Sequence, residues 1–90
     1  MSTPLFAAYL TFKEIDQMHR RPKGTAFRAF KRLSSGPLCE GEHYLYLDAR
    51  TRATEIDVLR HQGRIYASTV NAVLLTEAGY ALLKASLERG

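Results

Sequence analysis

Glycine and proline interrupt this chain at short intervals, and the interruptions limit it to short helices and strands. Pro22 and Gly24 end one segment, and Gly63 ends a later one. Proline cannot continue a helix, and glycine favours turns and helix ends, so we expect the segments to form separate elements. Ninety residues allow one domain with a single small hydrophobic core. No internal repeat or linker divides the chain, so this domain is expected to cover residues 1–90.

Two helices are predicted on either side of the first interruption. Thr11 precedes Glu14 by three positions, the spacing of a capping box, so a helix is expected from about Phe12 to Arg20. Thr25 is a favourable N-cap residue for a second helix, 26–34, which the glycine-proline pair that follows would end. Two short helices across a short turn are typical of a helix-turn-helix.

The second helix is predicted to be amphipathic. Phe27, Phe30 and Leu33 recur every three positions, and we expect the two rings to anchor the helix in the core. The other side then presents three cations to solvent: Arg28, Lys31 and Arg32. A solvated amphipathic helix would explain the phenylalanines equally well, but not why the preceding turn is also basic.

Strands and helices alternate in the second half of the chain. Strands are expected at His43–Asp48 and within Arg64–Leu75, most clearly at Asn71–Leu75, and we expect the two to pair. A helix is expected at Thr54–His61, and Thr76 is expected to cap a last helix that ends near Glu88. These elements predict an α+β fold: a small winged helix-turn-helix-like domain, with three or four helices and a short antiparallel sheet.

The first of these strands alternates tyrosine with leucine. We expect Leu45 and Leu47 to face the core and Tyr44 and Tyr46 to face solvent. Exposed tyrosines can stack on the bases of single-stranded nucleic acid, contact a protein partner or serve neither purpose, and the sequence leaves these alternatives open.

The excess positive charge is confined to one segment. Residues 13–32 carry seven basic and two acidic side chains, a net charge of +5, whereas the other seventy carry six and seven, a net charge of −1. Within 20–33 there are six basic side chains and no carboxylate. Such a concentration of charge favours a polyanionic partner.

We therefore predict that helix 26–34 binds duplex DNA in the major groove. Arg28 lies in its first turn and is the best candidate for a bidentate contact to guanine. The other cations of the segment are predicted to bind phosphates, which fix position without reading sequence. The backbone amides that follow Thr25 offer a further phosphate site at the helix N-terminus.

Three stretches of the chain carry recognisable motifs: YLTFKEIDQMHRRPKGTAFRAFKRL, CEGEHYLYL and VLLTEAGYALLKASL. Together, from about Leu10 to Leu87, they resemble the ORF6N-type domain of phage and prophage antirepressor proteins. The resemblance implies a DNA-binding transcription regulator, and because the chain ends soon after the last motif we expect a stand-alone binding module. It also implies that the contact surface is formed by Arg20, Arg21, Lys23, Thr25, Arg28, Lys31 and Arg32.

The sequence has no catalytic or metal-binding motif. Cys39 is the only cysteine, so no internal disulfide is expected and no zinc-type cysteine pair exists. His19, His43 and His61 lie far apart in sequence, and no glycine-rich loop is built to hold phosphate. We therefore expect no enzyme activity, no metal and no cofactor.

The remaining expectations concern location and partners. No signal peptide is recognisable, and no apolar run approaches the roughly 20 residues needed to cross a membrane, so a cytoplasmic protein is expected. A homodimer is expected through helix 77–88, whose Tyr80, Leu83 and Leu87 form an apolar stripe; alternatively, this helix only covers the sheet. The alternative function is a small phage protein that binds and inhibits a host protein or nucleoprotein complex, such as an inhibitor of host defence.

Overall fold

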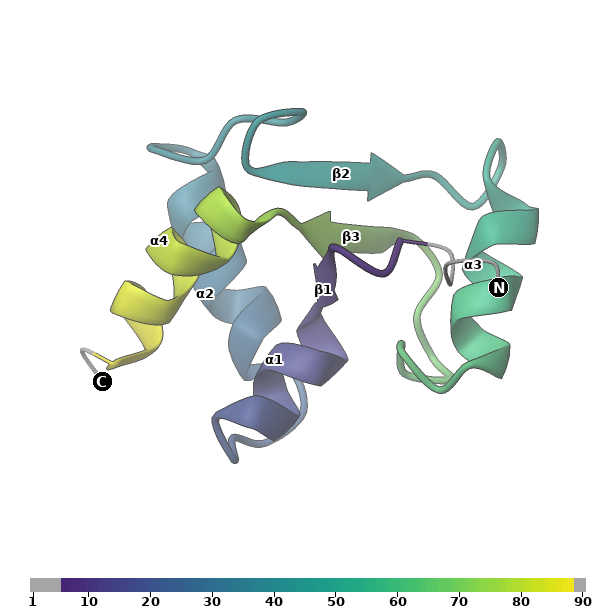
Figure 1. Cartoon of the computed structure of the whole chain (residues 1–90), viewed down its shortest axis with the longest axis horizontal. Helices are drawn as coiled ribbons and strands as arrows, with labels where there is room; N and C mark the ends of the chain where they lie inside the picture. Colours follow the sequence, from purple (N-terminus) through teal and green to yellow (C-terminus); the bar gives the residue numbers. More distant parts are fainter. Residues whose placement is uncertain (1–5, 89–90) are drawn as a thin grey trace.

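The computed structural model describes residues 6–88 as an α+β domain with four helices and a three-stranded antiparallel sheet (Figure 1). This arrangement confirms the expected fold class and is consistent with a small winged-helix-like domain. The elements are, in chain order, β1 (Leu10–Thr11), α1 (Phe12–Met18), α2 (Thr25–Ser34), β2 (Tyr44–Leu47), α3 (Ala53–His61), β3 (Ala72–Leu75) and α4 (Glu77–Glu88).

β3 is the central strand of the sheet and runs antiparallel to both neighbours, in the order β1-β3-β2. The predicted pairing of β2 with β3 is confirmed, with Tyr44 opposite Leu75 and Leu47 opposite Ala72. The chain between these two strands passes through α3 and not through a tight hairpin. As a result α3 lies at one end of the sheet, whereas α4 lies at the other (Figure 1).

Both faces of β3 are covered, so the domain has two hydrophobic clusters where a single core was expected. Val73 and Leu75 pack into one cluster with side chains of α1, α2 and α4. Ala72 and Leu74 pack into the other, with side chains of α3. Successive side chains of a strand point to opposite faces, so a fully buried strand needs an apolar cover on both sides.

The second covered face corrects the expected orientation of β2. Leu45 and Leu47 face the cluster beside α3, as predicted. Tyr44, however, packs into the opposite cluster, where its ring meets that of Phe30 edge-on with 4.8 Å between centroids. Tyr46 is the more exposed of the two tyrosines, with 42% of its surface accessible. The expectation of two outward tyrosines is therefore wrong for Tyr44.

The prediction that two phenylalanine rings anchor α2 in the core is confirmed for only one of them. Phe30 is buried, but 46% of the surface of Phe27 is exposed, and its ring contacts the ring of Phe12 at a centroid distance of 5.7 Å. The buried positions of α2 are Ala26, Ala29 and Phe30. Two of these are alanines, which are overlooked when only large apolar residues are considered. Because these alanines face the core, Phe27 lies at the edge of the contact between α2 and the core.

Local capping signals set where α1 and α4 begin. Thr11 and Glu14 form both hydrogen bonds of the capping box that starts α1. Thr76 accepts a hydrogen bond from the amide of Gly79 (3.1 Å) at the start of α4. A Cβ atom on Gly79 would lie 1.8 Å from the carbonyl oxygen of His43. Only glycine therefore fits where α4 meets the residue before β2.

α4 turns its apolar stripe toward the rest of the domain. Leu83 and Leu87 are buried in the cluster with α1 and α2, and Tyr80 is half-buried beside them. Leu82 keeps 36% of its surface exposed. Across residues 6–88, every helix is too short or too polar to cross a membrane.

Candidate nucleic-acid interface

One buried carboxylate holds the turn between α1 and α2. Asp16, on α1, is 1% exposed and accepts hydrogen bonds from the amides of Gly24 (3.1 Å) and Ala26 (2.8 Å). Gly24 is the N-cap residue of α2 and has a φ of +92°, a conformation that glycine adopts without strain. Asp16 therefore brings, from another helix, the negative charge that a helix N-terminus favours.

This arrangement corrects the role predicted for Thr25. Thr25 is the first residue of α2 and not its cap, and its hydroxyl donates to the carbonyl oxygen of Pro22 (2.8 Å). The carboxylate of Asp16 already binds the amide of Ala26, the first of the amides predicted to bind phosphate, and its negative charge opposes a phosphate at this helix N-terminus.

Tyr66 reaches the same carboxylate from the loop between α3 and β3. Its hydroxyl donates to Asp16 at 2.7 Å. Burial, followed by this hydrogen bond and the negative charge of Asp16, raises the pKa of Tyr66 to about 12. The hydroxyl therefore stays protonated near neutral pH and remains a donor to the carboxylate.

Arg64 connects α1 to the loop that carries Tyr66. Its guanidinium donates to both carboxylate oxygens of Glu14, each at 3.0 Å, and to the carbonyl oxygen of Phe6 at 3.0 Å. Burial alone would raise the pKa of Glu14, but hydrogen bonds from Arg64 and Thr11 together lower it. The loop is thus held in place as one wall of the surface beside α2.

The cations predicted to bind nucleic acid gather around α2 and the turn before it. Two of them lie over aromatic rings: the ammonium of Lys23 is 5.0 Å from the ring centroid of Tyr66, and that of Lys31 is 5.4 Å from the ring centroid of Phe27. Lys23 also donates to the hydroxyl of Ser68 (2.9 Å). All six cations are exposed: Arg20, Arg21, Lys23, Arg28, Lys31 and Arg32.

Two of the arginines lean toward α4. Arg21 donates to the carbonyl oxygen of Leu87 (3.3 Å), and Arg32 donates to the hydroxyl of Ser86 (3.4 Å). The positive charge is therefore spread over two sides of α2, one toward α4 and one toward the loop of Tyr66.

Within residues 6–88, none of these six cations forms an ion pair with a carboxylate. The ion pairs of that part of the chain involve other basic residues: Arg50, Arg52, Arg60 and Arg64. Among the residues that the structure describes, the charge excess seen in the sequence is therefore not neutralised by ion pairs with neighbouring acids.

A groove of about 710 Å³ lies beside α2, between this helix and the segment 65–73. We call it the aromatic groove, after the rings among its lining residues: Phe12, Phe27, Phe30, Tyr44, Tyr46 and Tyr66. Lys13 and Lys23 also line it, and Glu40 contributes a carboxylate. Sequence reasoning considered two tyrosines of β2 for stacking, but it missed Tyr66 and Lys13. Tyr66 joins the groove only because the loop folds back onto α1, a contact with no local signature.

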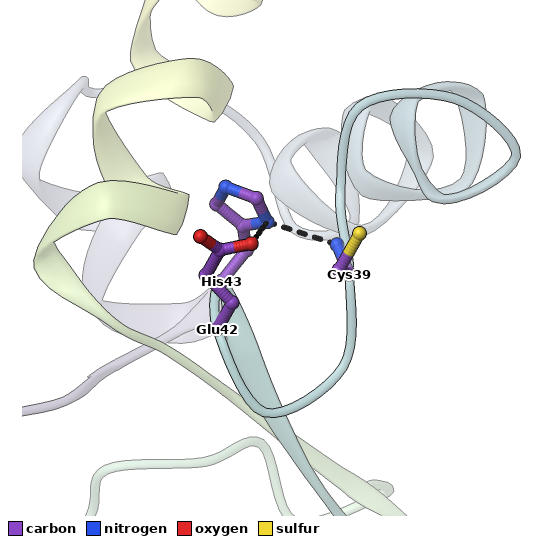
Figure 2. A group of neighbouring side chains, drawn as sticks. All are labelled: Cys39, Glu42 and His43. Atoms are coloured by element: carbon purple, nitrogen blue, oxygen red, sulfur yellow. Dashed lines mark hydrogen bonds and ion pairs between the residues drawn. The ribbon is translucent and has the colours of Figure 1, made fainter.

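The turn before β2 brings three further polar side chains together (Figure 2). The ligand atoms of Cys39, Glu42 and His43 lie within 4.8 Å of one another, a proximity that the sequence analysis did not foresee. The Nδ1 atom of His43 accepts a hydrogen bond from the amide of Cys39 (2.9 Å), and a carboxylate oxygen of Glu42 lies 3.9 Å from it. This hydrogen bond uses the lone pair that a metal ion would need. The closed turn therefore accounts for the cluster without a metal.

No protein-family model matches this chain, and no curated protein and no solved structure matches it either. The resemblance to the ORF6N-type domain therefore depends on its motifs alone and stays a prediction.

Proposed function

We propose that this chain binds duplex DNA through α2 and the turn before it, as a phage or prophage transcription regulator. The observation that most supports this proposal is the set of six exposed cations that have no carboxylate partner within residues 6–88. A double helix presents phosphates at regular spacing, and binding them releases condensed counterions, which favours association.

The contacts that hold α2 on the domain suit a helix that reads DNA. Phe30 anchors it in the hydrophobic cluster, and Asp16 holds its N-terminus against α1. Arg28 lies in the first turn of α2, the part of a recognition helix that reaches base edges, and it is the residue proposed to contact guanine. A helix that cannot shift on its domain keeps such a contact in register.

The remaining cations are proposed to bind phosphates on either side of the reading helix. Arg21 and Arg32 extend toward α4, whereas Lys23 and Lys31 extend toward the aromatic groove. Contacts spread in this way fix the position of the helix without reading sequence.

We further propose that two copies bind together through the exposed side of α4. One small module buries only about 600–1,000 Å² on DNA, and two copies on neighbouring half-sites discriminate better than one. Leu83 and Leu87 belong to the core, so the contact would use Leu82 and the exposed alanines around it.

The proposal is tested by equilibrium binding of the purified chain to a labelled duplex over a range of salt concentrations. We expect the logarithm of the affinity to fall linearly with the logarithm of the salt concentration, by about 0.9 for each phosphate bound. Arg50→Ala is the matched control, because it removes a cation whose side chain is 91% exposed and lies outside this surface. If no salt-dependent duplex binding is found, the proposal fails, and inhibition of a host protein or nucleoprotein complex becomes the function to test.

A further inference from the structure

Two of the aromatic rings that line the groove are exposed to solvent. Phe27 and Tyr46 line it from α2 and β2, with 46% and 42% of their surfaces accessible. Large apolar side chains that are exposed together around a hollow commonly mark a binding site. Their flat faces suit a flat ligand.

The rings of the groove are accompanied by ammonium groups. Lys13 and Lys23 lie 5.9 and 5.0 Å from the ring centroid of Tyr66, and Lys31 lies 5.4 Å from that of Phe27. None of these three lysines pairs with a carboxylate within the part of the chain that the structure describes. The groove therefore combines aromatic faces with cations that are free to bind an anion.

The lining residues include a single carboxylate, so one side of the groove is negatively charged and the other is positively charged. Glu40 comes from the turn before β2, whereas Lys13 and Lys23 come from α1 and the turn before α2. An anionic chain is attracted to the lysines and repelled by Glu40, which can instead accept hydrogen bonds from the polar edge of a ligand.

From these features we infer that the aromatic groove binds an unpaired base of single-stranded nucleic acid, with its phosphates held by Lys13, Lys23 and Lys31. Stacking of bases on aromatic side chains, beside cations that follow the backbone, is how proteins hold single strands without reading sequence. This inference rests on the proposed function, since the basic surface of α2 attracts the nucleic acid whose unpaired base the groove would take. Pyrimidine and purine bases both present a flat face, so we expect little sequence preference here.

The test uses two fluorescently labelled single strands of equal length, an oligothymidine and an abasic sugar-phosphate chain. Both carry the same charge, so a difference in affinity measures the bases alone. We expect the oligothymidine to bind more tightly, and Phe27→Ala and Tyr46→Ala each to lower its affinity about 5- to 150-fold, the effect of losing one stacked base. The same substitutions should leave the affinity for the abasic chain unchanged.

Two controls separate stacking from folding and from charge. Tyr46→Phe keeps the ring and should bind the oligothymidine as the wild type does, and thermal melting of each variant shows that it folds. Arg28→Ala should weaken duplex binding while the difference between the two single strands persists.

Equal affinity for the two strands, together with salt-dependent duplex binding, would overturn the base-binding groove and leave the proposed function standing. Binding to neither the strands nor the duplex would overturn both. An acidic peptide that shifts the NMR signals of Phe27 and Tyr46, where the oligothymidine does not, would overturn the groove proposal in favour of a protein partner.

Discussion

The amide of Ala26, at the start of α2, donates a 2.8 Å hydrogen bond to the buried carboxylate of Asp16 on α1. The hydroxyl of Tyr66 donates to the same carboxylate from a loop that lies 50 positions further along the chain. One side chain therefore positions the helix, the turn and the loop that together form the proposed nucleic-acid interface. A buried carboxylate is costly unless its oxygens are hydrogen-bonded, so these contacts support one another.

Asp16→Ala should strongly destabilise the domain. It leaves the amides of Gly24 and Ala26 and the hydroxyl of Tyr66 without their acceptor, at about 1–3 kcal/mol for each donor that stays buried. The measurement is urea unfolding at pH 7. Asp57→Asn is the control, because Asp57 is exposed and pairs with Arg60 at the surface, so its loss should cost at most about 1 kcal/mol. Similar losses for the two variants would contradict the structural role of Asp16.

Tyr66→Phe should lower stability by an amount that depends on pH. The pKa of Tyr66 is raised from 10.0 to about 12 in the folded chain, so the protonated hydroxyl stabilises the fold fully below pH 10. This contribution is lost as the pH rises from 10 to 12. At pH 8 the variant should be less stable by about 1.5–3 kcal/mol, the value of a hydrogen bond to a charged group. Urea unfolding of both proteins from pH 8 to 12 measures the gap, and a gap that stays constant above pH 10 would rule out this titration.

Phe30→Ala and Phe27→Ala should differ sharply in their effects on stability. Phe30 is buried, so its removal leaves a cavity and should cost about 3–5 kcal/mol. Phe27 is 46% exposed, and its removal should cost clearly less. Thermal melting of the two variants provides the comparison. Equal losses of stability would place both rings in the core, as the sequence analysis expected, and would remove Phe27 from the aromatic groove.

Arg28→Ala and Lys31→Ala should weaken duplex binding in different ways. Loss of a bidentate base contact should relax sequence preference and cost about 1–3 kcal/mol at the preferred site. Loss of a phosphate contact should weaken all duplexes similarly and reduce the salt slope by about one. Both are measured on a preferred and a scrambled duplex at several salt concentrations. If both variants bind the two duplexes as the wild type does, α2 is not the reading helix.

Leu82→Glu should dissociate the proposed homodimer without unfolding the chain. Leu82 lies on the exposed side of α4, and a charge there disrupts an apolar contact between copies. Mass measurement in solution at tens of micromolar reports the change, and melting shows whether the variant folds. Leu87→Glu is the contrasting variant, because it buries a charge in the core and should unfold the domain. A wild-type chain that is monomeric with and without DNA would eliminate the dimer.

The sequence by itself determined the local structure of this protein. The local signals were the threonine and glutamate at the start of α1, the threonine before α4 and the alternating pattern of β2, and each predicted the element that it marks. Each of these signals acts between residues that are near neighbours in the chain or along one strand, so local hydrogen bonding and side-chain periodicity suffice to read it. The concentration of cations before and within α2 can also be read from the sequence, because these residues are close together in the chain.

Only the tertiary structure decided which side chains of these elements are buried, which are exposed and which contact one another across the domain. Two alanines turned α2 so that Phe27 faces a groove, and a second covered face of the sheet drew Tyr44 inward. The contact of Tyr66 with Asp16 closes a span of 50 positions. Such contacts are chosen by packing and by the need to satisfy buried polar groups across the whole domain, and no local pattern along the chain encodes them.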